Sequence, residues 1–357
     1  MMKKYLFLIG AIFVGEATAF SQDLHFSQYN ENPSLINPAL TGSQYVMRTS
    51  VVYKDQWRSV TVPYKTFGAS FEMKFKASSW DRVDQFKTRT FKRSFNKLSG
   101  GLSFYSDKAG DGNMGTNQVN LSMASFIKAG ENSAISLGLQ GSVVQKTLDY
   151  NKLVFPNQYN GTTGYDQTIA NGEQYGANNF IYPDFAAGVL WMYSRDESSI
   201  GENNHMKADA GVGMFHINKP KQKFLSGTTE KLFSKYVFHA KLVMGIPHSN
   251  VGIAPSILYQ GQGPTKEIMG GIMIKYYLKD DSKYTGYIKK SSIGFGAYYR
   301  YKDAVIVSAL IEMGQYAIGL SYDINTSSLS KVSTLRGGPE IVLRFNSANP
   351  YLFQKRY

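Results

Sequence analysis

The residues with the most potential for chemistry are the histidines, and their positions do not form a site. They are His25, His205, His216, His239 and His248. The chain has no H-E-x-x-H zinc helix, no G-x-S-x-G nucleophile turn and no Walker phosphate loop. His239 next to Lys241 raises a catalytic pair as a hypothesis, but a histidine in an ordinary strand or rim explains the pattern better. We therefore expect no catalytic residue and no enzyme.

A short acidic turn is the best candidate for metal binding. Asp107, Asp111 and Asn113 lie in the sequence DKAGDGN, where carboxylate and amide oxygens stand close together among glycines. The glutamate that closes an EF-hand is missing at the required distance, so a polar turn is the favoured interpretation. The absence of cysteine excludes disulfides, thiolate metal sites and a lipid-modified N-terminal cysteine. We expect no metal and no cofactor.

The start of the chain, residues 1–21, has the pattern of a secretory signal peptide. Lys3 and Lys4 form the charged start, residues 5–14 are apolar, and Ala17 and Ala19 mark a cleavage site. An apolar run of about ten residues is short of the ~20 that a transmembrane helix needs, so an anchoring helix is the weaker alternative. The sequence thus predicts an exported protein.

The composition fits a protein with a polar interior and an apolar outer face. The mean hydropathy is only −0.28 and the formal charge is +13 at pH 7, yet aromatic residues make up 14% of the chain. In a soluble protein this charge would point to nucleic acid. In an exported protein, a basic lumen, the phosphates of lipopolysaccharide or an acidic partner explain it better. We expect no nucleic acid as a partner.

Most of the chain after residue 44 consists of short segments in which every second residue is apolar or aromatic. In residues 66–75, Phe67, Phe71 and Met73 share one face, whereas Ser70 and Glu72 share the other. Fourteen such segments occur, at 45–53, 66–75, 97–105, 116–127, 133–145, 183–193, 206–217, 235–246, 251–259, 266–277, 292–300, 303–313, 315–323 and 339–345. Small residues on the polar faces indicate a crowded interior.

This alternation predicts an all-β fold, a transmembrane antiparallel up-and-down β-barrel of about 14 strands over residues 45–345, followed by a C-terminal tail at 346–357. Aromatic residues recur near the strand ends, where the two interfaces of an outer membrane lie. A soluble sandwich or propeller also alternates, but no blade-length repeat or Trp-Asp signature supports a propeller. We expect the cell outer membrane as the location.

The lengths of the connections predict which end of the barrel faces outward. With both barrel ends in the periplasm, the long connections 147–179, 218–234 and 324–338 are outer loops, and 128–132, 246–250 and 314–315 are short periplasmic turns. The basic connection 76–96 breaks this rule. It is either an insertion that touches a partner or a sign that the strand count is off by one.

The segment 22–44 ahead of the first strand is predicted to be periplasmic or associated with the lumen. It contains two Asn-Pro pairs, which initiate turns. It is either a contact segment for a partner or a plain lead-in. The candidate contact residues are Phe26, Tyr29, Asn32, Pro33, Asn37 and Pro38.

Four further polar residues are candidates for the lumen or the rim of the barrel. They are Asp184, His216, Arg300 and Asp323. They either fix a ligand or pair with one another across strands, and structural pairing is the favoured interpretation.

Several motifs resemble one known family. The FSQ and NPxxxNPAxxG pattern of residues 26–42, followed by YKDQW at 53–57, is similar to the start of the PorP/SprF family of type IX secretion system outer-membrane proteins. Further matches are SDKAG at 106–110, YPD at 182–184, FHINKP at 215–220, YRYKDA at 299–304 and GLSYDIN at 319–325. The resemblance spans nearly the whole mature chain, although the 76–96 segment looks longer than usual and a tail follows the last predicted strand.

The resemblance implies a partner protein. Members are outer-membrane barrels of the Bacteroidota; some accompany the secretion motor, and others are paired with very large secreted adhesins, including those of gliding motility. The expected role is an accessory barrel that receives, helps secrete or anchors a secreted surface protein through its C-terminal sorting domain. Expected partners also include other type IX components, outer-membrane lipid and lipopolysaccharide. The alternative is a passive channel for small solutes, which requires an open lumen.

Overall fold

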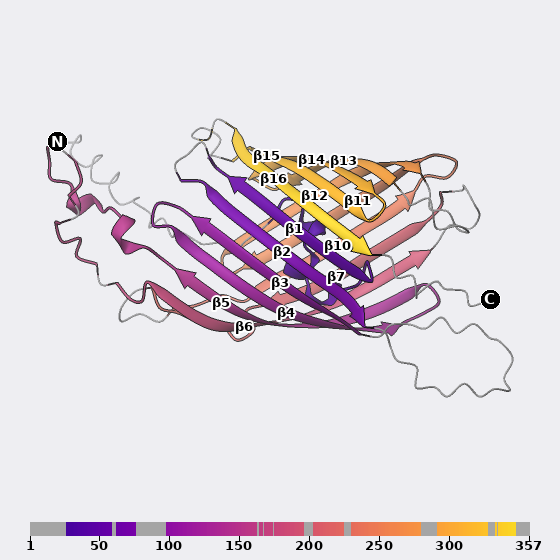
Figure 1. The fold of residues 1–357 in the computed structure, drawn as a ribbon, viewed down its shortest axis with the longest axis horizontal. Coiled ribbons are helices and arrows are strands. Elements are labelled where there is room, and N and C mark those ends of the chain that lie inside the picture. Colours follow the sequence, from indigo (N-terminus) through magenta and orange to yellow (C-terminus); the bar gives the residue numbers. More distant parts are fainter. Residues whose placement is uncertain are drawn as a thin grey trace, which may run out of the picture.

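The computed structural model describes residues 26–58, 62–75, 98–162, 164–166, 168–173, 175–195, 203–224, 230–279, 291–327, 333 and 335–347. The predicted signal peptide, the basic connection 76–96 and residues 348–357 of the predicted tail lie outside these ranges. Within them the strands close into one antiparallel barrel in which β1 pairs with β16 (Figure 1). Closure satisfies the backbone hydrogen bonds of every strand, as a sheet in lipid requires.

The barrel contains fourteen strands, and each overlaps one of the predicted segments. They are β1 (Met47–Gln56), β2 (Tyr64–Phe75), β3 (Leu98–Ala109), β4 (Met114–Lys128), β5 (Ser133–Thr147), β6 (Asn179–Arg195), β7 (Met206–Phe215), β10 (Lys235–Gly245), β11 (Val251–Gln262), β12 (Thr265–Lys279), β13 (Ser291–Arg300), β14 (Ala304–Met313), β15 (Tyr316–Asn325) and β16 (Arg336–Ser347). The predicted fold is therefore confirmed, and the strand count is not off by one. Among the described residues, no helix has the length and apolarity that a membrane crossing needs.

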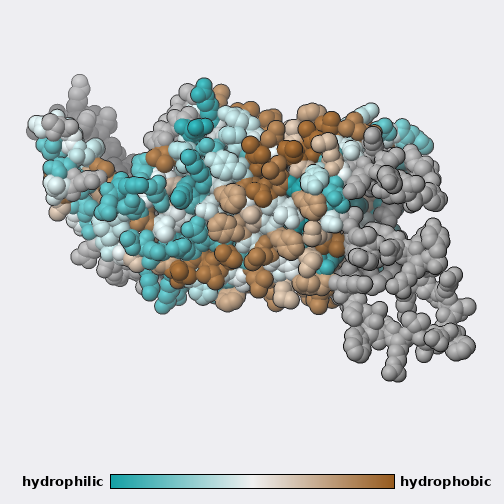
Figure 2. All heavy atoms as spheres, viewed as in Figure 1, coloured by the Kyte–Doolittle hydropathy of each residue, from teal (hydrophilic) through white to brown (hydrophobic). Residues whose placement is uncertain are grey.

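The two faces of the wall differ as the alternation predicts. On β5, the Leu139 side chain is 69% exposed on the outer face, whereas its neighbour Gln140 is 4% exposed and points inward. Figure 2 shows apolar residues gathered over the middle of the wall and hydrophilic residues toward the end at the left. An apolar band between polar ends is what a membrane-spanning barrel presents to lipid.

The connections differ in length between the two ends of the barrel. The β5–β6 connection contains η4 (Tyr150–Lys152) and η5 (Pro156–Gln158), and it extends beyond the barrel at the left of Figure 1. The β7–β10 connection contains the two-stranded β8 (Lys221–Gln222) and β9 (Glu230–Lys231). Both lie at one end, which we call the outer end because outer-membrane barrels have their longer loops outside. Residues 129–132, 246–250 and 314–315 form short turns at the opposite end.

Residues 26–46 lie inside the barrel, and we call them the plug. The plug is the indigo coil within the ring of strands in Figure 1, and it contains η1 (Tyr29–Glu31), η2 (Pro33–Leu35) and η3 (Pro38–Leu40). Proline begins η2 and η3, where its missing N–H costs nothing. The Asn37 side chain accepts a hydrogen bond of 2.9 Å from the backbone N–H of Ala39 and so caps η3. The two Asn-Pro pairs thus begin two of the turns of the plug.

The plug crosses the lumen from the outer end to the opposite end. Ser27 contacts Asp323 and Glu340, which lie where β15 ends and β16 begins at the outer end. At the other end of the plug, the Gly42 N–H donates to Glu72, 2.8 Å away, close to the end of β2. The chain then enters β1, so the plug fills the lumen that a passive channel would need open.

Candidate functional site

Ser27 lies at the centre of a buried ionic network near the outer end. Its hydroxyl donates to both carboxylate oxygens of Asp323, at 2.6 and 2.8 Å. The same oxygen accepts hydrogen bonds of 3.1 Å from Lys54 Nζ and of 3.1 Å from Arg300 Nη2. A serine hydroxyl has one proton and two lone pairs, so this one is fully used. The contact therefore demands a small hydroxyl at this position of the plug.

The backbone of the plug completes the network. The N–H groups of Ser27 and Gln28 donate to the two carboxylate oxygens of Glu340, at 2.7 and 2.8 Å. Arg300 and Lys54 also lie 3.3 and 3.5 Å from Asp323. These four charged side chains are at most 2% exposed. Breaking one partner of such a buried pair typically costs about 3–5 kcal/mol, because an uncompensated charge remains.

A second ionic cluster holds the middle of the plug. Glu31 accepts from Arg344 Nη1 at 2.5 Å and lies 3.2 Å from Arg48 Nη2. Arg344 also bonds Glu312, which pairs with Lys275 at 2.8 Å. The plug carboxylate is thereby connected to strands β1, β12, β14 and β16. Burial alone would raise the pKa of Glu31, but the charges of Arg344 and Arg48 outweigh it and hold that pKa below its ordinary value.

The Glu31 pairs predict a plug that loosens in acid. A depressed pKa means that the stabilisation is fully present above the ordinary value of 4.5 and is lost as the pH falls through the lower folded value. Conductance of single barrels in planar bilayers should therefore rise as the pH is lowered below 4.5. Glu31→Gln barrels should leak already at neutral pH and change less on acidification. An identical acid profile in both proteins would contradict the assignment to Glu31, since strand carboxylates would then explain all of it.

Glycines line much of the wall where η3 packs. A Cβ atom on Gly138 of β5 would collide with the backbone of Pro38 and Ala39. On Gly213 of β7 it would lie 2.7 Å from the carbonyl oxygen of Ile36, a distance that real Cβ contacts do not show. Gly188 and Gly211 make similar room for the Asn37 side chain. The glycines of β5, β6 and β7 thus form a groove shaped for this part of the plug.

Polar contacts fix η3 within this groove. The Asn37 amide donates to the Val189 carbonyl at 2.9 Å and lies 3.2 Å from Nε2 of His239. Ser136 donates to the carbonyl of Ala39 at 2.9 Å. His239 therefore supports the plug, although the sequence raised a catalytic pair with Lys241 as a hypothesis.

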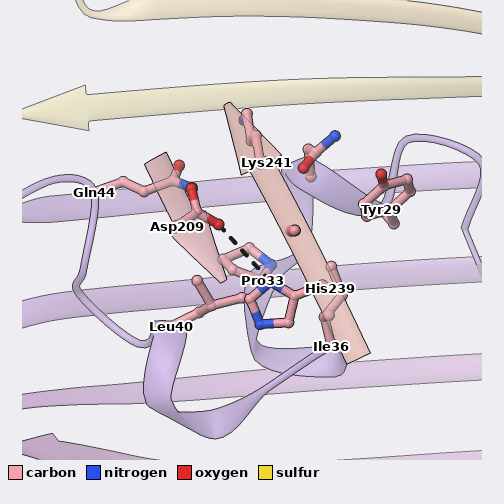
Figure 3. Close-up of a pocket in the computed structure, with 10 residues that line it drawn as sticks. Tyr29, Pro33, Ile36, Leu40, Gln44, Asp209, His239 and Lys241 are labelled. Atoms are coloured by element: carbon pink, nitrogen blue, oxygen red, sulfur yellow. Dashed lines mark ion pairs between the residues drawn. The ribbon is translucent and has the colours of Figure 1, made fainter. Parts of the chain in front are cut away.

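A small cavity lies between the plug and strands β7 and β10. Figure 3 shows His239 beside the plug residues Leu40 and Ile36, with Asp209 pointing toward the His239 ring, and His239 Nδ1 is 3.7 Å from Asp209 Oδ1. The cavity measures about 10 Å³, roughly the room that one water molecule needs. Burial raises the pKa of Tyr29 to about 12, and its hydroxyl bonds Ser256 at 2.8 Å. The cavity is far too small for a substrate.

The six predicted contact residues of the N-terminal segment lie buried in the lumen. They are Phe26, Tyr29, Asn32, Pro33, Asn37 and Pro38. Phe26 packs against the ring of Tyr105, with ring centres 6.1 Å apart, and Tyr29 belongs to the largest apolar cluster of the interior. The contacts that these side chains make in this structure are with the barrel itself. Contact with another protein through them would require the plug to leave.

The four predicted lumen and rim residues form two separate pairs. Arg300 and Asp323 meet in the Ser27 network, as described above. Asp184 and His216 pair with each other at 2.9 Å, which ties β6 to the start of the β7–β10 connection. His216 has a positive φ of 55°, so this pair also fixes a left-handed turn. Arg300 and Asp323 thus pair between two strands, whereas the pair of Asp184 and His216 joins a strand to a connection.

Sequence reasoning missed several residues that join the plug to the wall. Ser27, Glu31, Lys54 and Glu340 were not singled out, although Lys54 and Glu340 are charges within alternating strands. Such charges, when they face inward, need partners inside the lumen. Inward-facing charges of this kind could have indicated that another segment of the chain lies in the lumen. The segment with the FSQ motif was a candidate for that role.

The acidic turn considered for calcium is a β-turn region between β3 and β4. Asp107 lies in β3 and accepts a hydrogen bond of 2.6 Å from Thr66. Asn113 adopts a positive φ of 45° at the end of the turn. Asp107 thus bonds its register partner on β2, and only Asp111 and Asn113 lie in the turn that connects β3 to β4.

Four of the motifs that carry the family resemblance meet where the plug binds the wall near the outer end. Ser27 comes from the FSQ motif, Lys54 from YKDQW, Arg300 from YRYKDA and Asp323 from GLSYDIN. Residues that stand up to 296 positions apart in sequence thus make one network. These four motifs are short and weak individually, but each contributes one residue to the same buried network.

Comparison with known proteins identifies the same family. The family model described as "Type IX secretion system membrane protein PorP/SprF" matches residues 18–345. No curated protein sequence gives a significant match.

Several solved outer-membrane barrels are similar at a low level. A TodX mutant described as a monoaromatic hydrocarbon channel has a TM-score of 0.45 at 10% identity, with 88% of this chain and 94% of that chain covered. BamA from Haemophilus ducreyi lacking three POTRA domains has a TM-score of 0.39 at 9% identity, with 85% and 71% covered. The NanC porin has a TM-score of 0.37 at 7% identity, with 84% and 98% covered. Similarity at this level says nothing about what this chain does.

The match over nearly the whole chain, together with a closed transmembrane barrel, settles the family and the outer-membrane location. The chain belongs to the PorP/SprF family of type IX secretion system membrane proteins.

Proposed function

We propose that this protein is an accessory barrel of type IX secretion that receives or anchors a secreted surface protein at its outer end, through the C-terminal sorting domain of that partner. The observation that carries the proposal is the filled lumen. The plug is bonded to the wall near both ends and in the middle, so it lies across the passage that a solute channel would need. Binding of a partner outside the lumen is compatible with a permanently filled barrel.

The outer end offers a surface for such a partner. The β5–β6 connection, residues 148–178, rises from the barrel, and we call it the outer arm (Figure 1). Tyr159 and Tyr165 are 52% and 61% exposed on it, and their rings meet edge-on at 5.5 Å. Val154 and Ile169 are exposed on the same arm. Exposed aromatic and aliphatic side chains grouped on one loop are typical of a protein-binding surface.

The outer arm is held in place by the neighbouring connection. The Tyr150 hydroxyl donates to the carbonyl of Phe224 at 2.6 Å, and the Gly176 N–H donates to the same oxygen at 2.8 Å. Tyr150 also stacks on Tyr175, with ring centres 4.2 Å apart. A surface fixed in this way loses little conformational entropy when a partner binds.

The proposal predicts that changing the outer arm releases the partner. We expect a version tagged after Tyr357, extracted from its native outer membrane in mild detergent, to copurify with a large secreted protein that carries a C-terminal sorting domain. Replacing Tyr159 and Tyr165 with serine should lower its recovery about tenfold or more, because exposed aromatic anchors dominate such interfaces. Mass spectrometry with a labelled standard measures the recovery.

Tyr316→Ser is the matched control, since Tyr316 is an equally exposed tyrosine at the opposite end of the barrel. It should leave the recovery unchanged. Recovery of the barrel alone from wild-type membranes would overturn the proposal. Full recovery with the Tyr159 and Tyr165 variant would move the contact away from the outer arm.

A further inference from the structure

A groove opens on the membrane-facing side of the wall at the outer end. Its floor consists of Tyr236 and Phe238 of β10 and Tyr259 of β11. Phe238 lies directly opposite Tyr259 in the strand register, and their ring centres are 5.8 Å apart. Because these side chains point away from the lumen, the floor continues the apolar band that faces lipid.

A glycine leaves the gap in this floor. Gly261 of β11 stands opposite Tyr236 on one side and Lys266 of β12 on the other. A larger residue would fill the space between these two side chains, and its Cβ would lie 3.1 Å from the Tyr259 hydroxyl oxygen. The groove measures about 600 Å³, within the usual range for a site that holds a small molecule or part of a lipid.

The β7–β10 connection forms the upper side of the groove. The Leu232 N–H donates to the carbonyl of Pro220 at 2.9 Å, which holds the two limbs of this connection together. Phe233 packs over the β11–β12 turn, where a Cβ on Gly263 would lie 2.7 Å from its ring. This places Lys219 and Lys231 beside the floor.

The charge of the groove has one sign. Lys219, Lys231 and Lys266 are its only charged lining residues, and all three are exposed. None of them forms an ion pair with a carboxylate in the described part of the chain. Three unpaired ammonium groups above an aromatic floor, at the level of an outer leaflet, complement phosphate groups joined to acyl chains.

We propose that this groove binds a phosphorylated lipid of the outer leaflet, with an acyl chain against Tyr236, Phe238 and Tyr259 and phosphates between Lys219, Lys231 and Lys266. The proposal depends on the outer end facing the cell exterior, and it is independent of the proposed reception of a secreted protein. The same connection carries Phe224, which holds the outer arm. A bound lipid therefore stabilises the connection on which the outer arm rests.

The test uses the purified full-length protein in detergent and bisphosphorylated lipid A as the probe, with native mass spectrometry to measure the bound fraction. We expect lipid A to bind and its dephosphorylated form to bind at least tenfold more weakly. The triple variant K219Q/K231Q/K266Q should lose about a hundredfold in affinity, because each lysine at an anionic lipid surface contributes separately.

The matched control is K65Q/K128Q/K207Q, which removes three exposed lysines elsewhere on the wall and should bind like the wild type. Heat-modifiable migration in gels verifies that both variants remain folded barrels. A second variant, Phe238→Ser, should weaken binding of lipid A with all three lysines present.

Three outcomes would overturn the proposal. The first is equal affinity of the wild type and K219Q/K231Q/K266Q for lipid A. The second is complete displacement of lipid A by inorganic phosphate, which would make this a site for the free anion. The third is binding of an acidic peptide in preference to lipid A, which would make the groove a protein site.

Discussion

Replacing Gly138 with valine is expected to unseat the plug while the barrel remains folded. The added side chain would occupy the space of Pro38 and Ala39, whose backbone cannot move aside without breaking the cap of η3. Valine suits a strand, and Gly138 retains its neighbours Ala124 and Gly188 in the register. The effect should therefore fall on the plug rather than on the wall.

The absence of cysteine from the chain provides a direct measurement. A single cysteine introduced as Ser34→Cys lies in the plug at a position that is 2% exposed. We expect a water-soluble thiol reagent to label it on the order of a hundredfold faster in the Gly138→Val background, because labelling follows the population of the unseated plug.

Gly141→Val is the control in the same strand. Gly141 faces outward, and its added Cβ would meet only the ring of Phe185 at an ordinary 3.9 Å. Labelling at the wild-type rate is expected there. Slow labelling in the Gly138→Val protein would show that the glycine groove does not hold the plug in place.

Ser27→Asp is expected to turn a sealed barrel into a conducting one. The substitution puts a third carboxylate beside Asp323 and Glu340, and it removes the hydroxyl that Lys54 and Arg300 bond. Lys54 and Arg300 already balance Asp323 and Glu340, so the added carboxylate leaves one buried negative charge uncompensated, at a cost on the order of 3–5 kcal/mol. The part of the plug near Ser27 should therefore dissociate from the wall of the barrel.

Single-barrel conductance in planar bilayers measures this result. Wild-type protein should show little steady current at neutral pH, whereas Ser27→Asp should show long-lived openings. Ser27→Thr retains the hydroxyl and should resemble the wild type. Steady current through the wild-type barrel would revive the passive channel as a function, and a sealed Ser27→Asp barrel would assign the seal to the Glu31 cluster.

The strands could be predicted from the sequence because their signal is local. Alternation within ten residues decides which side chain meets lipid, and Phe71 and Glu72 need no distant partner to reveal their faces. The fate of the N-terminal segment could not be predicted in this way. Ser27 contacts Asp323 across 296 positions. Because Ser27 lies on an irregular segment, no alternation of apolar and polar residues predicts this contact.

The functional residues were partly predictable for the same reason. Asp323 and Arg300 could be singled out as polar residues near strand ends, but their common partner could not. The two Asn-Pro pairs correctly indicated turns, although nothing in their composition says that the turns lie inside a barrel. The room for them comes from glycines on three other strands, and that fit exists only after the sheet has closed.

The position of Ser27 also bears on how the molecule is made. Lys54 and Glu340 are register partners on the first and last strands of the barrel, and both bond this one residue. When those strands meet, both charges are removed from water, and the contacts with Ser27 then offset part of the cost. We therefore expect closure of the sheet and capture of the N-terminal segment to be coupled. The N-terminal segment contacts both the first and the last strand, and so it stabilises the closed sheet. An assembly intermediate that lacks this segment should stall as an open sheet.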